Sequence, residues 1–272
     1  QMSVPEHSLS GCPAPARAGE RARHNMLIEA IDLEKSYGAT PAVRGVSIRA
    51  TRGELIGVLG PNGAGKSTTL RMLAGTLVPD RGCVRISGVD AAKQPDEARD
   101  RIGYLPEAAH GFGELAVAEF LVFAAEAHGL WGAARDDAVR RVVDTLALAS
   151  VASRPLASLS KGWRQRAWLG QAILHDPAVL ILDEPTDGLD PVQKVALRGL
   201  LQTLARDKAI VMSTHSFEEA EALCSRVIII ADGRIVADQE TRRLLDEHGR
   251  LAPAFLRLTG LEPTRDRAGV GG

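Results

Sequence analysis

Residues 60–68 have the sequence Gly-Pro-Asn-Gly-Ala-Gly-Lys-Ser-Thr. This segment matches all four fixed positions of the phosphate-binding loop, which are Gly60, Gly65, Lys66 and Ser67. In such a loop the backbone N–H groups surround phosphates and the lysine reaches the terminal ones. The required context is present, because residues 54–59 form a short apolar run typical of a buried strand and residues 67–74 favour a helix. The loop therefore predicts that the chain binds a nucleoside triphosphate.

A second apolar run, residues 178–184, is long enough for a buried central strand and ends in two carboxylates. We expect Asp183 to hold Mg²⁺ together with the hydroxyl of Ser67. The next residue, Glu184, is then suited to polarise an attacking water molecule. Residues 210–215 form another strand-like run that ends in His215, and strand ends in one parallel sheet lie beside the same crevice.

Composition limits the remaining possibilities. The 272 residues include 45% hydrophobic and 25% charged residues, which is ordinary for a globular protein. Their 33 Lys and Arg against 34 Asp and Glu give a net charge of −1, so no overall attraction to nucleic acid or anionic lipid is predicted. The most apolar helical stretch, residues 115–130, contains two glutamates and a histidine, so we expect no membrane crossing.

The three cysteines, Cys12, Cys83 and Cys224, are far apart in sequence and form no Cys-x-x-Cys pair. We therefore expect neither a disulfide framework nor a zinc site, and a reducing cytosol is the simplest compartment. Residues 1–25 are predicted to be a disordered leader. No apolar segment precedes Cys12, so it is predicted to be a chance cysteine in a flexible tail and not a lipid attachment site.

Strand-like runs at 27–33, 42–50 and 101–105 surround the phosphate loop, whereas residues 116–149 change to helical spacing. The aromatic residues of this helical part are expected to pack mostly within it. Residues 251–260 form a short amphipathic end that is expected to pack back on the core, and the chain beyond residue 262 is expected to be flexible.

Between the glycine-rich loop at residues 60–68 and the acidic strand end at residues 178–184 lies Leu159-Ser-Lys-Gly-Trp-Arg-Gln-Arg166. With it, the order of motifs resembles that of the ATP-binding cassette (ABC) ATPases over roughly residues 27–245. The signature of that family is Leu-Ser-Gly-Gly-Gln. Leu159, Ser160 and Gly162 match the signature, while Lys161 and Trp163 depart from it.

The resemblance implies an α/β fold: a P-loop NTPase (RecA-like) core with a mostly parallel sheet, an N-terminal antiparallel β subdomain and an inserted α-helical subdomain. It places the ATPase domain at residues 26–245, the helical subdomain at about 108–165 and a C-terminal tail at 246–272. A single copy of each motif, on separate segments, further implies that two cassettes close head to tail, as a homodimer or with a related cassette.

The resemblance also assigns roles to residues. Tyr37 would stack on adenine, Asp183 would be the Walker B aspartate and Glu184 the catalytic base. His215 would contact the γ-phosphate, while Ser160 and Gly162 would bind the ATP of the partner. Asp190 would belong to the D-loop. The Walker A loop would comprise Gly60, Pro61, Asn62, Gly63, Ala64, Gly65, Lys66, Ser67 and Thr68.

One departure from the family's usual sequence indicates which members of the family the chain resembles. The family commonly has glutamine in the loop that joins its core to the helical subdomain, and this chain has Glu107 there. With the Lys161-containing signature, this looks like the ATPase subunits of ABC-2 type exporters, including gliding-motility-like systems. Glu107 retains an oxygen that can contact Mg²⁺ or water.

The predicted function is that of an ATP-hydrolysing subunit that drives a separate transmembrane permease, with ATP and Mg²⁺ as cofactors. The subunit is expected to be cytoplasmic, peripheral at the inner face of the cell membrane, and not to bind nucleic acid. Two alternatives stay open: a soluble ABC ATPase that acts on nucleic acid or ribosomes, and a small-molecule kinase that uses the same loop.

Overall fold

The computed structural model describes residue 12 and residues 25–107 and 111–261. Its strands are β1 (Met26–Tyr37), β2 (Thr40–Thr51), β3 (Leu55–Leu59), β4 (Arg81–Ile86), β5 (Val89–Asp90), β6 (Ile102–Leu105), β7 (Val179–Asp183), β8 (Ala209–Ser213), β9 (Arg226–Ala231) and β10 (Arg234–Glu240). Its α-helices are α2 (Lys66–Leu73), α3 (Pro95–Arg99), α4 (Val117–Ala127), α5 (Gly132–Thr145), α6 (Lys161–Ile173), α7 (Pro191–Leu204), α8 (Phe217–Leu223), α9 (Thr241–Leu244) and α10 (Ala252–Thr259). Two short 3₁₀ helices, η1 (Ala149–Val151) and η2 (Leu156–Ser158), precede α6.

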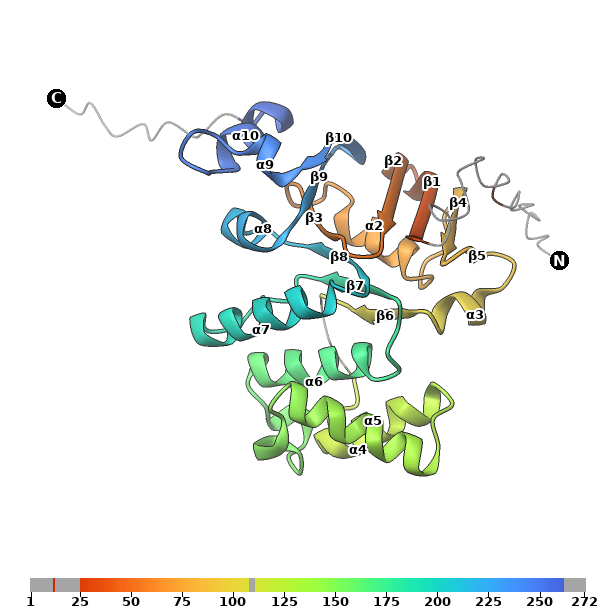
Figure 1. The fold of residues 1–272 in the computed structure, drawn as a ribbon. Coiled ribbons are helices and arrows are strands. Elements are labelled where there is room, and N and C mark those ends of the chain that lie inside the picture. The colour runs from red at the N-terminus through yellow and green to blue at the C-terminus, as the bar shows by residue number, and fades with distance from the viewer. Residues whose placement is uncertain (1–11, 13–24, 108–110, 262–272) are drawn as a thin grey trace.

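The strands form two sheets. The first has the order β2-β1-β4-β5 and is antiparallel, and the second has the order β10-β9-β3-β8-β7-β6. Neighbours from β9 to β6 pair in parallel, while β10 pairs with β9 antiparallel. The predicted fold class is confirmed: a mostly parallel sheet lies beside an antiparallel one, with helices around them (Figure 1).

The central strands are buried on both faces, as a parallel sheet covered on two sides requires. Alternate residues face opposite sides because successive side chains in a strand point to opposite faces. On β7, Leu180 and Leu182 belong to the core under α6, α7 and α8, whereas Val179 and Ile181 belong to the core shared with α2 and the antiparallel sheet. The sheet thus separates two hydrophobic cores.

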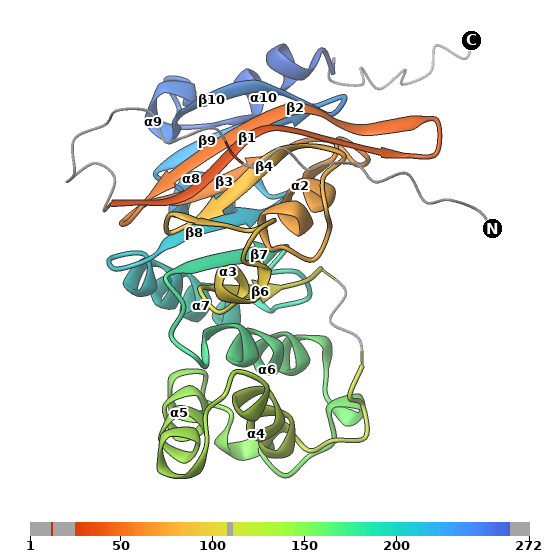
Figure 2. The same ribbon diagram turned by 90° about the vertical axis from the view of Figure 1, so that its right-hand side faces the viewer.

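The helices α4, α5 and α6 form a body beyond one edge of the parallel sheet (Figure 2). Its core contains Phe120 and Leu121 of α4 and Val142 of α5, all at most 1% exposed. Phe120 also packs against Trp168 of α6, with ring centroids 5.1 Å apart. Helix α6 begins in this body and continues to Ile173, and the next element along the chain is β7, so α6 connects the helical body to the parallel sheet.

The C-terminal segment packs back on the core, as expected from its amphipathic pattern. Leu251 is fully buried, and the ring of Phe255 in α10 packs edge-on against Phe217 of α8, with centroids 4.9 Å apart. The residues predicted to be flexible beyond 262 lie outside the described residues. No helix in the described part of the chain is long and apolar enough to cross a membrane.

The expectation that the chain has no disulfide was wrong. Cys12 and Cys83 are bonded, with Cα atoms 5.4 Å apart. The backbone of Cys12 is also held, because its N–H donates to the Asp90 carboxylate over 3.2 Å and its carbonyl accepts from Arg85 Nη2 over 2.8 Å. Cys12 is therefore no chance cysteine. A pairing between residues 71 positions apart depends on where β4 lies in the fold, which cysteine spacing does not reveal. The rest of the predicted leader, apart from Asn25, lies outside the described residues.

Candidate functional site

The phosphate loop connects the end of β3 to the start of α2 and needs glycine at two positions where another backbone is close. A Cβ on Gly60 would lie 2.3 Å from the carbonyl oxygen of Ile230 in β9. A Cβ on Gly65 would lie 2.4 Å from the carbonyl oxygen of Ala42, and Gly65 has φ +101°, a conformation that favours glycine. The loop is thus pressed between β2 and β9.

A cavity of about 430 Å³ opens over this loop. It is lined by Ala42, Asn62, Gly63, Ala64, Gly65, Lys66, Ser67, Thr68, Glu107 and Glu184. The structure therefore brings together most of the loop with one carboxylate from the end of β7 and one from the segment after β6. Backbone N–H groups at the start of α2, together with its positive helix end, suit this cavity to an anionic phosphate chain.

Lys66 folds back over the loop. Its ammonium group donates to the carbonyl oxygens of Gly60 and Pro61, at 2.7 and 3.1 Å. These carbonyls hold the charge beside the cavity and leave one donor for a further partner, because an ammonium group has three.

Asp183, at the end of β7, lies between two serines. Its Oδ1 accepts from Ser67 Oγ of α2 at 3.3 Å and from Ser213 Oγ of β8 at 2.5 Å. Carboxylate and hydroxyl oxygens are the ligands that Mg²⁺ prefers. Within the described residues no cluster of three or more His, Cys, Asp or Glu side chains could hold a metal. The Ser67–Asp183 pair supplies one hydroxyl and one carboxylate, which fits an ion that a phosphate chain also holds, as Mg²⁺ is usually bound.

Glu184 and His215 face each other across the strand ends of β7 and β8. The distance from His215 Nδ1 to Glu184 Oε2 is 2.8 Å, so Nδ1 carries the hydrogen when the carboxylate is ionised. Burial raises the pKa of Glu184 above its ordinary value, and the nearby His215 and Lys66 partly oppose this shift. The carboxylate is therefore a stronger base than an exposed glutamate.

The backbone of Glu184 adopts φ +50°, an uncommon conformation for a residue with a side chain. Three contacts hold it. Its N–H donates to Ser213 Oγ at 2.9 Å, and its carbonyl oxygen accepts from Gln165 Nε2 at 3.3 Å and from the N–H of Asp187 at 3.1 Å. Such strained residues concentrate at functional sites, where the surrounding structure fixes a side chain in one position.

The other predicted site residues do not line this cavity. Tyr37 ends β1, pairs with Thr40 across the hairpin and is 49% exposed. Ser160 caps α6 by accepting from the N–H of Trp163 at 3.5 Å, and Gly162 lies in the first turn of the same helix. Asp190 caps α7 by accepting from the N–H of Gln193 at 2.8 Å. Ser160, Gly162 and Asp190, which lie at the starts of α6 and α7, are therefore not among the residues that line the cavity over the phosphate loop.

Sequence analysis missed two residues of the site, Ser213 and Gln165, which hold Asp183 and Glu184 in place. A serine at the end of an apolar strand carries no chemical signal by itself. Gln165 stands inside the signature segment, but its distance along the chain from Glu184 gave no reason to pair them. A buried glutamine, 6% exposed, needs a partner, and that requirement is the one signal available.

Comparison with known proteins gives a consistent result. Residues 43–187 match the family model described as ABC transporter. The chain is 40% identical over 212 residues to the Nod factor export ATP-binding protein I of Paraburkholderia xenovorans (strain LB400), covering 78% of this chain and 70% of that protein. A solved structure titled "Structure of ATP binding subunit of ABC transporter" is 32% identical, with a TM-score of 0.78, and covers 86% of this chain and 99% of that chain. The bacterial cassette MJ0796, solved as a dimer, shares the fold at 23% identity, with a TM-score of 0.73 over 79% of this chain and 98% of that chain.

A phosphate loop at the end of β3, followed by an Asp-Glu pair at the end of β7, defines a P-loop ATPase. The chain belongs to the ABC transporter family. It is an ATP-binding transporter subunit and an ATP hydrolase.

Proposed function

We propose that this chain is the ATPase subunit of an ABC-2 type exporter, and that it uses Mg²⁺-ATP to drive a separate membrane permease from the cytoplasmic side. The observation that carries the proposal is the joint placement of the phosphate loop, the Ser67–Asp183 pair and the Glu184–His215 pair around one cavity. The signature with Lys161 and the presence of Glu107 at the cavity support the exporter subtype.

In this proposal the loop binds the phosphates of ATP and Lys66 places its charge on the terminal ones. Ser67 and Asp183 hold Mg²⁺, and Glu107, which also lines the cavity, supplies a further oxygen. When bound, the ion neutralises charge on the phosphate chain. Tyr37 stacks on the adenine, for which its exposed ring at the end of β1 is available.

Glu184 orients and deprotonates the attacking water molecule. His215 holds the Glu184 carboxylate through Nδ1–H and leaves Nε2 free to contact the γ-phosphate. The raised pKa of Glu184 favours proton uptake from water. The two carboxylates have separate roles because they have different partners: Ser67 and Ser213 hold that of Asp183, and His215 holds that of Glu184.

The site is completed in a head-to-tail dimer. Ser160, Gly162 and Asp190 stand at the starts of α6 and α7, apart from the phosphate loop of their own chain. The start of α6 carries no acidic side chain in its first turn, and the positive end of the helix suits phosphate. We therefore assign it to the ATP bound by a second cassette. The solved MJ0796 cassette, which has the same fold, is dimeric.

The permease docks on the helical body near Glu107. Phe112, Phe123 and Trp131 of this body are 45%, 48% and 64% exposed. Phe112 and Phe123 also contact each other, with ring centroids 5.1 Å apart. Exposed aromatic side chains that gather in one place are typical of protein interfaces. Phe120 is buried in the core of the body, and Trp163 and Trp168 of α6 are partly buried against it. The expectation that most aromatic residues pack inside the body therefore fails for Phe112, Phe123 and Trp131.

The test is the variant Glu184→Gln. We expect it to bind ATP and form ATP-dependent dimers, while ATP turnover falls by about 100-fold or more, because the base is lost and the binding groups are intact. ATP binding by calorimetry, dimerisation by light scattering and phosphate release without any acceptor are measured, each with and without Mg²⁺.

The matched control is Glu218→Gln, which removes an exposed carboxylate from the first turn of α8. This control should hydrolyse ATP at the wild-type rate. Full turnover by Glu184→Gln contradicts the assigned base. Formation of ADP and a phosphorylated acceptor, without free phosphate, would instead indicate a kinase, and salt-sensitive binding to nucleic acid would indicate the soluble ABC alternative.

A further inference from the structure

Helix α6 and the segment that follows Glu184 are joined at the first turns of the helix. Lys161, the first helical residue, forms an ion pair with Asp187, with 2.6 Å between Nζ and Oδ2. The aliphatic part of Lys161 lies against Gly188, where a Cβ would be 2.4 Å from its Cδ. One turn further along, Gln165 donates to the carbonyl oxygen of Glu184. Residues four apart lie on one face of a helix, so Lys161 and Gln165 hold the same segment.

Gly162 allows this close approach. A Cβ at this position would lie 2.5 Å from Oε1 of Gln193 and 3.3 Å from Cδ2 of Leu189. The start of α6 is therefore in direct contact with residues 187–193, which lead from the catalytic glutamate into α7.

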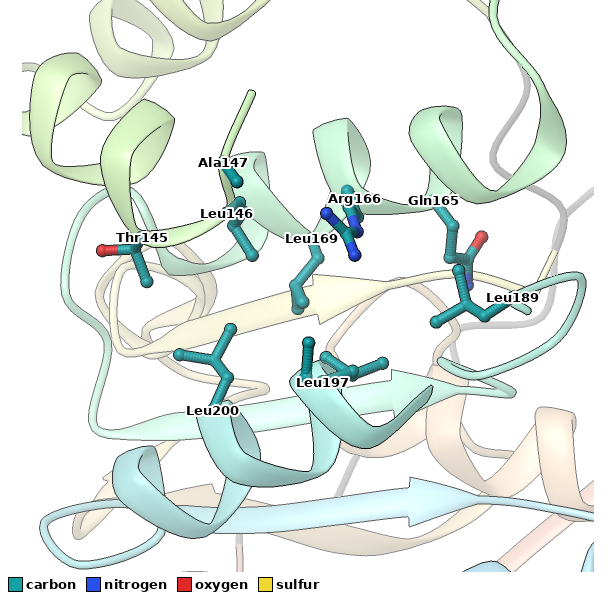
Figure 3. A pocket seen from close by; sticks show the side chains of 10 residues that line it. Thr145, Leu146, Ala147, Gln165, Arg166, Leu169, Leu189, Leu197 and Leu200 are labelled. Carbon is teal, nitrogen blue, oxygen red and sulfur yellow. The ribbon is translucent and has the colours of Figure 1, made fainter. Parts of the chain in front are cut away.

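Farther along, the two helices are less closely packed. An apolar pocket of about 100 Å³ lies between α6 and α7 (Figure 3). Gln165 and Leu189 stand at one end of this pocket, and Leu169, Leu197 and Leu200 line the rest of it. The contacts at the start of α6 are therefore the ones that join it to the segment after Glu184.

The ion pair itself is exposed, with 60% of the Lys161 side chain and 42% of the Asp187 side chain accessible. Exposed ion pairs contribute little to the stability of a fold. No acidic side chain lies in the first turn of α6, so the counter-charge comes from the segment after Glu184. A contact of this kind can fix the position of a segment without changing the free energy of unfolding much.

We propose that Lys161 and Asp187 are positioning residues for ATP hydrolysis: their ion pair locks the start of α6 to the 184–190 segment so that the two move as one body. The proposal rests on the proposed function. In the proposed dimer, the start of α6 contacts the ATP that the partner subunit binds. The ion pair joins this start to the 184–190 segment of the same subunit, so it also sets the position of Glu184 beside the ATP that this subunit binds. Lys161 takes the place of a signature glycine, and its role is directed to its own chain and not to the phosphates.

The experiment compares the full chain with the variants Lys161→Met, Asp187→Asn, both together, and the conservative variant Lys161→Arg. We expect each single variant to lower kcat by a similar factor, about five-fold or more, while KM for ATP changes little, because the phosphate loop is untouched. The double neutral variant should be no slower than either single one, since both remove the same contact. Lys161→Arg keeps the positive charge and should keep most of kcat, and the rates of the wild type and of Lys161→Arg should fall more with added salt than those of the neutral variants.

The control is the exposed ion pair Arg140–Asp137 of α5, at 2.9 Å, in the variants Arg140→Met and Asp137→Asn. These should keep the wild-type kcat, and all variants should keep the wild-type melting temperature. A slow Lys161→Met beside a wild-type Asp187→Asn would overturn the proposal and place Lys161 on the nucleotide itself. Wild-type rates in every variant would overturn it as well.

Failure of this proposal can be told from failure of the proposed function. If Glu184→Gln forms ATP-dependent dimers while the Lys161 and Asp187 variants hydrolyse ATP normally, only the positioning role is wrong. If Glu184→Gln forms no dimer with ATP, the composite site is wrong, and the positioning role between two sites falls with it.

Discussion

Ser213 links the two acidic residues of the site through a single hydroxyl group. It donates to Asp183 Oδ1 and accepts from the N–H of Glu184, and it is fully buried. The donated bond orients the Asp183 carboxylate, the proposed Mg²⁺ ligand, and the accepted bond holds the backbone of Glu184 at its positive φ. One side chain thereby fixes the geometry of both functional carboxylates.

We therefore expect Ser213→Ala to lower kcat by about ten-fold or more, because small displacements of catalytic groups are costly. It also leaves the N–H of Glu184 without its partner, which costs about 1–3 kcal/mol of stability when the group stays buried. ATP turnover and thermal unfolding are measured together.

The control is Ser225→Ala. Ser225 makes a similar pair of bonds, to the N–H and the carbonyl oxygen of Leu55, at the opposite end of β3 from the phosphate loop. It should lose stability and keep kcat relative to folded protein. Equal turnover by Ser213→Ala and wild type would show that Glu184 needs no help from Ser213.

At the level of elements, two histidines connect the helical body to the parallel sheet. His128 follows α4 and His175 follows α6, and their rings stack with centroids 3.7 Å apart. His175 Nε2–H donates to the carbonyl oxygen of Ile102 in β6 over 3.1 Å, so its buried Nδ1 bears no hydrogen in the neutral ring. Burial, and then the neighbouring His128, lower the pKa of His175 to about 4.

The folded chain thus keeps His175 neutral, whereas the unfolded chain protonates it below its ordinary value of 6.5. Between pH 6.5 and 4 the unfolded state binds more protons, so stability falls as pH falls. Asp100 opposes this shift and Lys208, which pairs with Asp176, supports it. We expect His175→Gln to lose less of its melting temperature than wild type between pH 7.5 and about pH 5.

Melting curves across this pH range provide the measurement, with His248→Gln as the control because His248 is an exposed histidine, 77% accessible at its side chain. The control should follow the wild-type profile. Identical profiles for wild type and His175→Gln would mean that this pair does not set the acid sensitivity of the joint between α4 and β6.

At the level of the whole molecule, the Cys12–Cys83 bond closes a loop that contains β1, β2, β3 and the entire phosphate loop. A cross-link across 71 positions removes entropy from the unfolded chain worth about 4 kcal/mol in the chain-entropy model. Hydrogen bonds from Arg85 of β4 and to Asp90 of β5 also hold the backbone of residue 12 against these strands.

We expect a thiol reductant to lower the melting temperature of the wild-type chain and to leave that of Cys12→Ser unchanged. Thiol titration under denaturing conditions should give one thiol, Cys224, before reduction and three afterwards. Three thiols without a reductant would contradict the bond. In a reducing compartment the reduced form would be present, so the measurement also bears on where the protein works.

Local sequence was sufficient for the parts of this protein that a few consecutive residues define. The nine residues of the phosphate loop, the apolar strands β3, β7 and β8 and the Asp183–Glu184 pair were predicted from residues 54–68, 178–184 and 210–215. Short segments suffice there because burial selects continuous apolar runs and phosphate binding requires fixed spacing.

Tertiary structure alone decided which distant residues support them. Ser213 is 30 positions from Asp183, Gln165 is 19 from Glu184, and Cys12 is 71 from Cys83. The first contact exists because parallel strands bring their ends to one edge, the second because α6 packs beside the end of β7, and the third because β4 lies beside residue 12. A serine, a glutamine or a cysteine has the same chemistry anywhere in a chain, and only the packing of the sheets and α6 gives these residues their partners.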